Sequence, residues 1–99
     1  MTADDAMAAM SNVQIDDGTF RVTEWTIGPG QSIPEHEHLF DYVVIPLVDD
    51  TMHVVGADGK SSPTTLRVGE SYSRPAGAVH SVWNHGSRTI VFVEVERLR

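Results

Sequence analysis

The sequence contains no cysteine, few basic residues and no long apolar run. Without cysteine, this chain of 99 residues forms neither a disulfide nor a thiolate metal site, so a transition metal would need nitrogen and oxygen ligands. Seven Lys and Arg against 14 Asp and Glu give a formal net charge of −7, which argues against a nucleic-acid partner. No apolar run approaches the roughly 20 residues of a membrane span, and the first residues do not resemble a signal peptide. We therefore expect a cytoplasmic protein without a membrane partner.

The composition that remains is typical of one small globular domain. With 40% hydrophobic and 21% charged residues, the chain is neither disordered nor embedded in a membrane, and its length leaves room for a single core. Residues 1–11 (MTADDAMAAMS) could form about two turns of helix by propensity, but nothing caps them firmly. We expect residues 1–11 to be a tail or arm and residues 12–99 to form the domain.

From Asn12 onward, short runs of β-branched and aromatic residues alternate with Gly, Pro, Asp and Ser at turns. This pattern predicts an all-β sandwich or barrel. We expect nine strands, over residues 12–15, 19–27, 33–38, 41–48, 52–55, 64–67, 70–74, 79–84 and 89–96. Residues 19–27 and 89–96 carry apolar side chains on both faces, which predicts a barrel interior on one side and the interface of a homodimer on the other.

His36 and His38 are the first candidates for a chemical role. They lie two residues apart in an expected strand, so their imidazoles leave the same face, as two ligands of one metal would. The spacing alone is a weak signal, because a surface histidine pair beside Glu35 and Glu37 would give the same pattern.

The wider spacing of glycine, histidine and proline resembles the two signature motifs of the cupin superfamily. Gly30 is followed after five residues by His36, and after one more by His38, as in the opening of the first motif. The second motif has its counterparts further along the chain, at Gly69, Pro75, Ala76, Gly77, His80 and Asn84. The two motifs occur in the expected order, and the resemblance covers residues 18–95.

This resemblance implies a cupin-type β-barrel or jelly roll of two antiparallel sheets, with six strands in each sheet. It also implies a metal ion held inside the barrel by His36, His38 and His80. Neutral imidazoles suit divalent Fe, Mn, Ni, Zn or Cu, and three such ligands leave coordination positions open for water, substrate or dioxygen. Gly30 and Gly77 are expected at tight turns that direct the histidines inward.

One ligand of the family pattern is missing. The first motif places a glutamate four residues after its second histidine, and here Tyr42 stands there with Asp41 beside it. By strand alternation Tyr42 shares the inward face with His38, whereas Asp41 points the other way unless a bulge intervenes. We therefore expect a three-histidine site, with Tyr42 as a nearby donor, a phenolate ligand or a core aromatic residue.

Three further residues could contribute to the site if they point inward. An inward His53 could shuttle protons near the metal, since imidazoles titrate near neutral pH, whereas an outward His53 would be an ordinary lining or surface residue. An inward Arg74 could hold a substrate carboxylate, although a surface ion pair is the simpler interpretation. His85 lies at an expected turn and is predicted to be exposed.

Cupins that are similar in having three histidines and no glutamate include thiol dioxygenases and a diketone-cleaving dioxygenase. The resemblance therefore implies a small-molecule metalloenzyme of dioxygenase type, with Tyr42 and His53 as the candidate catalytic residues. The alternatives are a non-catalytic cupin module that binds a small ligand and a barrel that holds no metal, because a fold alone does not decide function. For the metalloenzyme and for the binding module, the expected partner is a small molecule.

Overall fold

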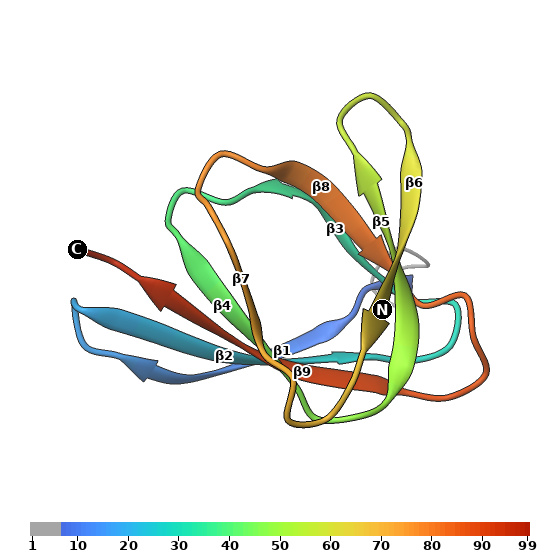
Figure 1. The fold of residues 1–99 in the computed structure, drawn as a ribbon, viewed down its shortest axis with the longest axis horizontal. Coiled ribbons are helices and arrows are strands. Elements are labelled where there is room, and N and C mark those ends of the chain that lie inside the picture. The colour runs from blue at the N-terminus through green and yellow to red at the C-terminus, as the bar shows by residue number, and fades with distance from the viewer. Residues whose placement is uncertain (1–6) are drawn as a thin grey trace.

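The computed structural model describes residues 7–99, and it is built from strands (Figure 1). In chain order the strands are β1 (Met10–Asp16), β2 (Phe20–Ile27), β3 (Ser32–Glu37), β4 (Tyr42–Pro46), β5 (Asp50–Gly56), β6 (Ser61–Leu66), β7 (Tyr72–Arg74), β8 (Val79–Trp83) and β9 (Ile90–Arg97). Each of the nine strands overlaps one that the sequence predicts. Within the described residues there is no helix long and apolar enough to cross a membrane.

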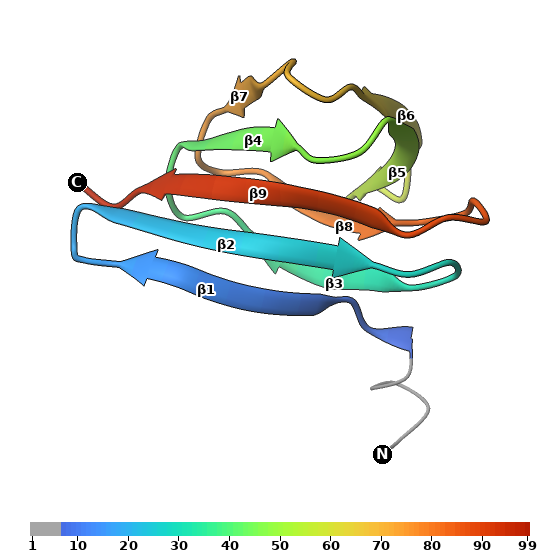
Figure 2. The same ribbon diagram turned by 90° about the horizontal axis from the view of Figure 1, so that it is seen from below.

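The strands form two antiparallel sheets, as expected for a jelly roll. One sheet has five strands in the order β1-β2-β9-β4-β7, and the other has four in the order β3-β8-β5-β6. Figure 2 shows β1, β2, β9 and β4 side by side, with the four-stranded sheet behind them. The expectation of six strands in each sheet is wrong for the described part of the chain, because its short loops and 93 described residues supply only nine strands.

The first strand begins slightly earlier than the expected domain boundary. β1 starts at Met10, and the amide of Ala9 donates a hydrogen bond of 2.8 Å to the carbonyl of Ser32. The segment just before residue 12 is thus attached to the barrel through the β3 edge. Residues 1–6, which carry most of the expected helical turns, lie outside the described residues.

Strand β9 separates the interior of the barrel from its outer surface by alternation. Ile90 and Phe92 are 0% and 1% exposed and join the core, which also contains Ile27 and Val44. The intervening Val91, Val93 and Val95 face outward and are only partly buried, opposite residues of β2 and β4. The outer face of the five-stranded sheet is therefore apolar, as the sequence predicted.

The turns that lead into β3 and β8 adopt backbone conformations that only glycine tolerates easily. Gly30 has a φ of 77° and Gly77 a φ of 105°, both in the left-handed region. Asn84 fixes the first of these turns, because its carbonyl accepts a hydrogen bond from the amide of Gly30. Its fully buried side chain donates to the carbonyls of Ile27 and Arg88. The asparagine of the second motif thus has a structural role.

Candidate metal centre

A bulge in β3 decides which side chains enter the barrel. Ile33 pairs with Val82 and points into the core, so regular alternation would send Glu35 inward after it. The register shifts between Ile33 and His36, and His36 then pairs directly with His80. The extra residue reverses the alternation, which turns His36 inward and leaves Glu35 exposed.

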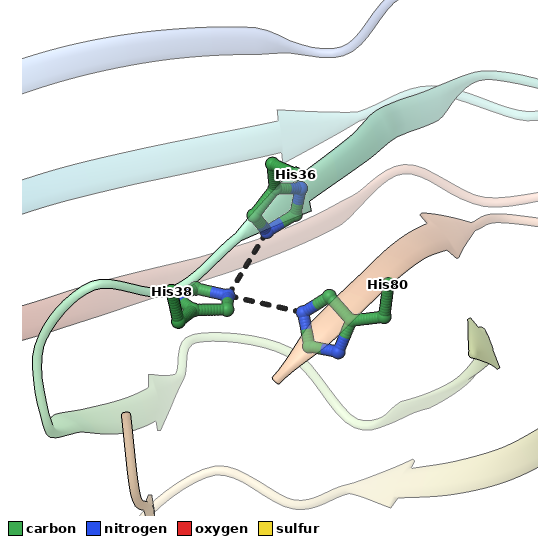
Figure 3. A group of neighbouring side chains, drawn as sticks. All are labelled: His36, His38 and His80. Carbon is green, nitrogen blue, oxygen red and sulfur yellow. Dashed lines mark hydrogen bonds between the residues drawn. The ribbon is translucent and has the colours of Figure 1, made fainter. Parts of the chain in front are cut away.

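The three histidines of the two motifs meet inside the barrel (Figure 3). His36 lies near the end of β3, His38 just after it, and His80 on β8. The Nε2 atom of His38 is 2.9 Å from Nε2 of His36 and 3.0 Å from Nε2 of His80. The ligand atoms of all three lie within 4.8 Å of one another, and within residues 7–99 no carboxylate joins this cluster. We call this cluster the histidine triad.

The tautomers of the triad favour a shared cation. Nδ1 of His36 lies 2.7 Å from the carbonyl of Pro34, so Nδ1 carries the proton and Nε2 offers its lone pair to the cluster. Nε2 of His38 faces two other Nε2 atoms, and a single ring nitrogen cannot satisfy both of them with one proton. Three imidazole nitrogens directed at one point fit the donor set of a divalent transition metal, so these residues could hold one.

The environment of the triad favours the neutral form of His38 and His80. Burial, followed by the charges of the neighbouring His36 and His80, lowers the pKa of His38 to about 4. Burial and His36 also lower the pKa of His80. Neutral imidazole is the form that binds metal, so protons compete weakly for these nitrogens at neutral pH.

Tyr42 occupies the position where the family motif has glutamate, and it lies against the triad. Its ring stacks on that of His38 with centroids 4.0 Å apart and planes 17° from parallel. Burial raises the pKa of Tyr42 to about 12, so its hydroxyl stays protonated. Asp41 points away, and its carboxylate accepts a hydrogen bond from the amide of Ala76. The phenol, and not the aspartate, therefore stands beside the histidines.

A cavity of about 280 Å³ opens from the triad between the two sheets. His80 and Tyr42 belong to its wall, and much of the remaining lining is apolar. The other polar residues of the lining are Ser62, Thr64, Tyr72, Arg74 and Glu94. This space could hold a small organic molecule next to the triad.

Glu94 is a site residue that the sequence analysis missed. It is 9% exposed and lines both this cavity and a second hollow beside His36 and His38. Burial, followed by the charge of Glu96, raises the pKa of Glu94 to about 7, although a hydrogen bond from Trp25 opposes the shift. The sequence could have predicted its inward position, because Glu94 lies at the same alternate positions of β9 as the buried Ile90 and Phe92.

The structure does not bring His53 to the triad. Its strand neighbours Met52 and Val54 line the cavity, so the alternation of β5 places His53 on the outer face of the four-stranded sheet. There its ring lies 4.9 Å from that of His85, and its Nδ1 is buried without a hydrogen-bond partner. This placement does not support the proton-shuttle role that we expected for His53, whereas His85 is exposed as expected.

Comparisons with known proteins agree with this architecture. No protein-family model matches the chain. A curated protein from Pseudomonas aeruginosa, the β-alanine degradation protein BauB, is 40% identical over 89 residues, which cover 89% of this chain and 92% of the relative. The crystal structure of a cupin domain from Bordetella pertussis is 39% identical, with a TM-score of 0.87, and the match covers 91% of this chain and 93% of that one.

A more distant structure shares the fold. The polyketide cyclase RemF from Streptomyces resistomycificus matches with a TM-score of 0.72 and 24% identity, over 92% of this chain and 66% of that one. At this identity the likeness extends to the fold alone. The two antiparallel sheets, both signature motifs and the close similarity to the Bordetella domain together show that the chain belongs to the cupin superfamily.

Proposed function

We propose that this protein is a small-molecule metalloenzyme of dioxygenase type, which binds one divalent transition metal through His36, His38 and His80. The observation that carries the proposal is the convergence of three imidazole nitrogens beside a cavity with open space. When bound, the ion would supply Lewis-acid polarisation and open coordination positions. Fe, Mn, Ni and Zn all suit this donor set, because selection depends on supply as much as on geometry.

The residues around the triad support catalysis rather than ligand binding alone. Tyr42 restrains the ring of His38 by stacking and keeps its own proton, so it can donate a hydrogen bond to a bound molecule. Glu94 can accept or release a proton near neutral pH inside the cavity, which suits a general acid or base. We therefore assign a catalytic role to Tyr42 and proton transfer to Glu94, and no catalytic role to His53.

The name of the relative gives limited support for the substrate. BauB is described as a protein of β-alanine degradation, and β-alanine is a small, charged organic molecule. A cavity of about 280 Å³ lies just below the size usual for sites that bind drug-sized ligands. A small metabolite is therefore the substrate class that we propose.

A non-catalytic module that binds a small ligand is the second candidate. It is favoured by the apolar side chains that make up much of the cavity wall, such as Val44, Val82 and Phe92. The two candidates differ in turnover, because a binding module would saturate with ligand and leave the ligand unchanged. We also propose that the protein works as a homodimer. Its location in the cytoplasm stays a prediction.

The metal assignment is tested by metal analysis of protein purified without a histidine tag. We expect about one equivalent of transition metal in the wild type and nearly none in a His36→Ala, His38→Ala double variant. The matched control is a His53→Ala, His85→Ala double variant, which loses the same number of imidazoles outside the triad. Equal metal content in the wild type and the triad variant would overturn the assignment.

Catalysis is tested separately, by oxygen uptake of the Fe(II)-loaded protein in air with thiols, diketones and related enolisable acids. We expect uptake that depends on the substrate and disappears in the triad variant. If no compound is consumed, the dioxygenase proposal fails. Saturable binding of one of these compounds without its consumption would then favour the binding module.

A further inference from the structure

The cavity contains one permanent positive charge, and it stands opposite Tyr42. Arg74 is the β7 partner of Tyr42 in the antiparallel ladder, and directly opposed residues project from the same face of a sheet. Since Tyr42 points inward, Arg74 points to the same side, and both residues line the cavity. Tyr42 thus contacts both ends of this part of the cavity, because it pairs with Arg74 in the ladder and stacks on His38 of the triad.

The guanidinium of Arg74 is held in place without being neutralised. Its Cζ lies 4.7 Å from the centre of the Tyr72 ring, and Nη1 donates a hydrogen bond of 3.0 Å to the carbonyl of Ser73. The one ion pair found within residues 7–99 joins Arg21 to Glu96, so Arg74 has no carboxylate partner there. The remaining N–H groups of this guanidinium are available for a ligand.

The other charges of the cavity wall also favour an anion. Glu94 is the only acidic side chain in the lining, and it is buried inside the barrel, whereas Arg74 is exposed at the mouth. Tyr72, whose ring lies under the guanidinium, and Tyr42, which is opposite Arg74 in the ladder, both contribute phenol groups to the same cavity wall. A planar carboxylate is the anion that matches a guanidinium fork with flanking hydroxyl donors.

We propose that Arg74 binds the carboxylate of the substrate, and that the substrate is a short-chain carboxylic acid whose other end reaches the histidine triad. The inference deepens the proposed function, on which it rests, by naming the substrate class of the same cavity. The apolar wall between the two ends accommodates a short hydrocarbon body. Arg74 is in this view a specificity-determining residue.

The test uses metal-free protein, so that it does not depend on the metal assignment. Propionate and propionamide have nearly the same shape and differ in charge, and each is titrated into ¹⁵N-labelled protein while amide and arginine Nε signals are followed by NMR. We expect propionate to shift the signals of Tyr72 and Arg74 saturably, and propionamide to bind about tenfold more weakly or not at all. Equal affinities for the two probes, or no binding of propionate, would overturn the proposal.

Variants locate the binding site. Arg74→Met is expected to weaken propionate binding about tenfold, and Arg74→Lys is expected to restore part of the loss because it keeps the charge without the planar fork. Arg67→Met, at an exposed position outside the cavity, is the matched control and should bind as the wild type does. An unchanged affinity in Arg74→Met would overturn the inference.

A second hollow makes one more control necessary. On the outer side of β4 and β9, Arg74 and Arg97 both line an open depression with Phe20 and Val43. Arg97→Met should leave propionate binding unchanged if the anion enters the barrel, and weakened binding would overturn the proposal in favour of the outer hollow. Failure of the metal assignment would appear in the metal analysis and would leave these titrations unaffected.

Discussion

Replacing Glu94 by glutamine should change how the stability of the barrel depends on pH. Burial raises the pKa of this carboxyl from 4.5 to about 7 in the folded protein. The folded state therefore binds more protons than the unfolded state between these pH values. The stabilisation is fully present below pH 4.5 and is lost as pH rises through about 7.

The size of the effect follows from the two pKa values. One pH unit corresponds to about 1.4 kcal/mol, so the full difference is about 3 kcal/mol, of which about 2.5 kcal/mol falls between pH 5 and pH 8. Glutamine keeps the shape of the side chain and can still accept the Trp25 hydrogen bond, but it does not titrate. We expect Glu94→Gln to gain about 2.5 kcal/mol relative to the wild type between pH 5 and pH 8.

The assay is urea unfolding of the metal-free protein, followed by circular dichroism at pH 5, 6, 7 and 8. All other ionisable groups are the same in the two proteins, so the comparison isolates the contribution of Glu94. Glu70→Gln, at an exposed position, serves as the control and should follow the wild type at every pH. Parallel stability curves for Glu94→Gln and the wild type, or a carboxyl titration of Glu94 by NMR near its ordinary value, would refute the reasoning.

Two further predictions concern the scaffold. Asn84→Ala should lower the free energy of unfolding by roughly 2–4 kcal/mol in urea denaturation, because it leaves the buried carbonyl of Ile27 and the partly buried carbonyl of Arg88 without their donor. A loss below about 0.5 kcal/mol would contradict the structural role of Asn84. The apolar outer face of the five-stranded sheet, where Leu47 is 45% exposed, should form the dimer interface. Sedimentation should then show a dimer for the wild type and a monomer for Val93→Glu, and a monomeric wild type at micromolar concentration would count against the interface.

The strands and the histidine triad could be predicted from the sequence because both depend on local patterns. Alternating apolar residues and turn glycines mark each strand, and the spacing around His36, His38 and His80 resembles two known motifs. The ends of the strands were less predictable. Met10 and Ser11 extend β1 through backbone pairing with Trp25 and Thr26, which no side-chain pattern in a polar segment reveals.

The direction of single side chains was harder to predict, because it depends on register. The β3 bulge reverses the alternation after Ile33, and the sequence does not decide it, because Pro34 is compatible with either a bulge or a regular edge strand. Glu94 was not singled out as a site residue, although its parity with Phe92 places it inside. His53 lies between the apolar Met52 and Val54 but shares its own face of the strand with Val55, so its direction was left open until the pairing of β5 with β8 was known.

The triad joins parts of the chain that are distant in sequence, and this has a consequence for the lifetime of the protein. His38 and His80 are 42 residues apart. Any ion that they share bridges these segments only while the chain is folded, so it stabilises the folded state by the free energy of its binding. This cysteine-free chain has no covalent substitute for the link. Starving a cell of the metal should therefore speed unfolding and degradation of the barrel, so that the amount of this protein follows the metal supply.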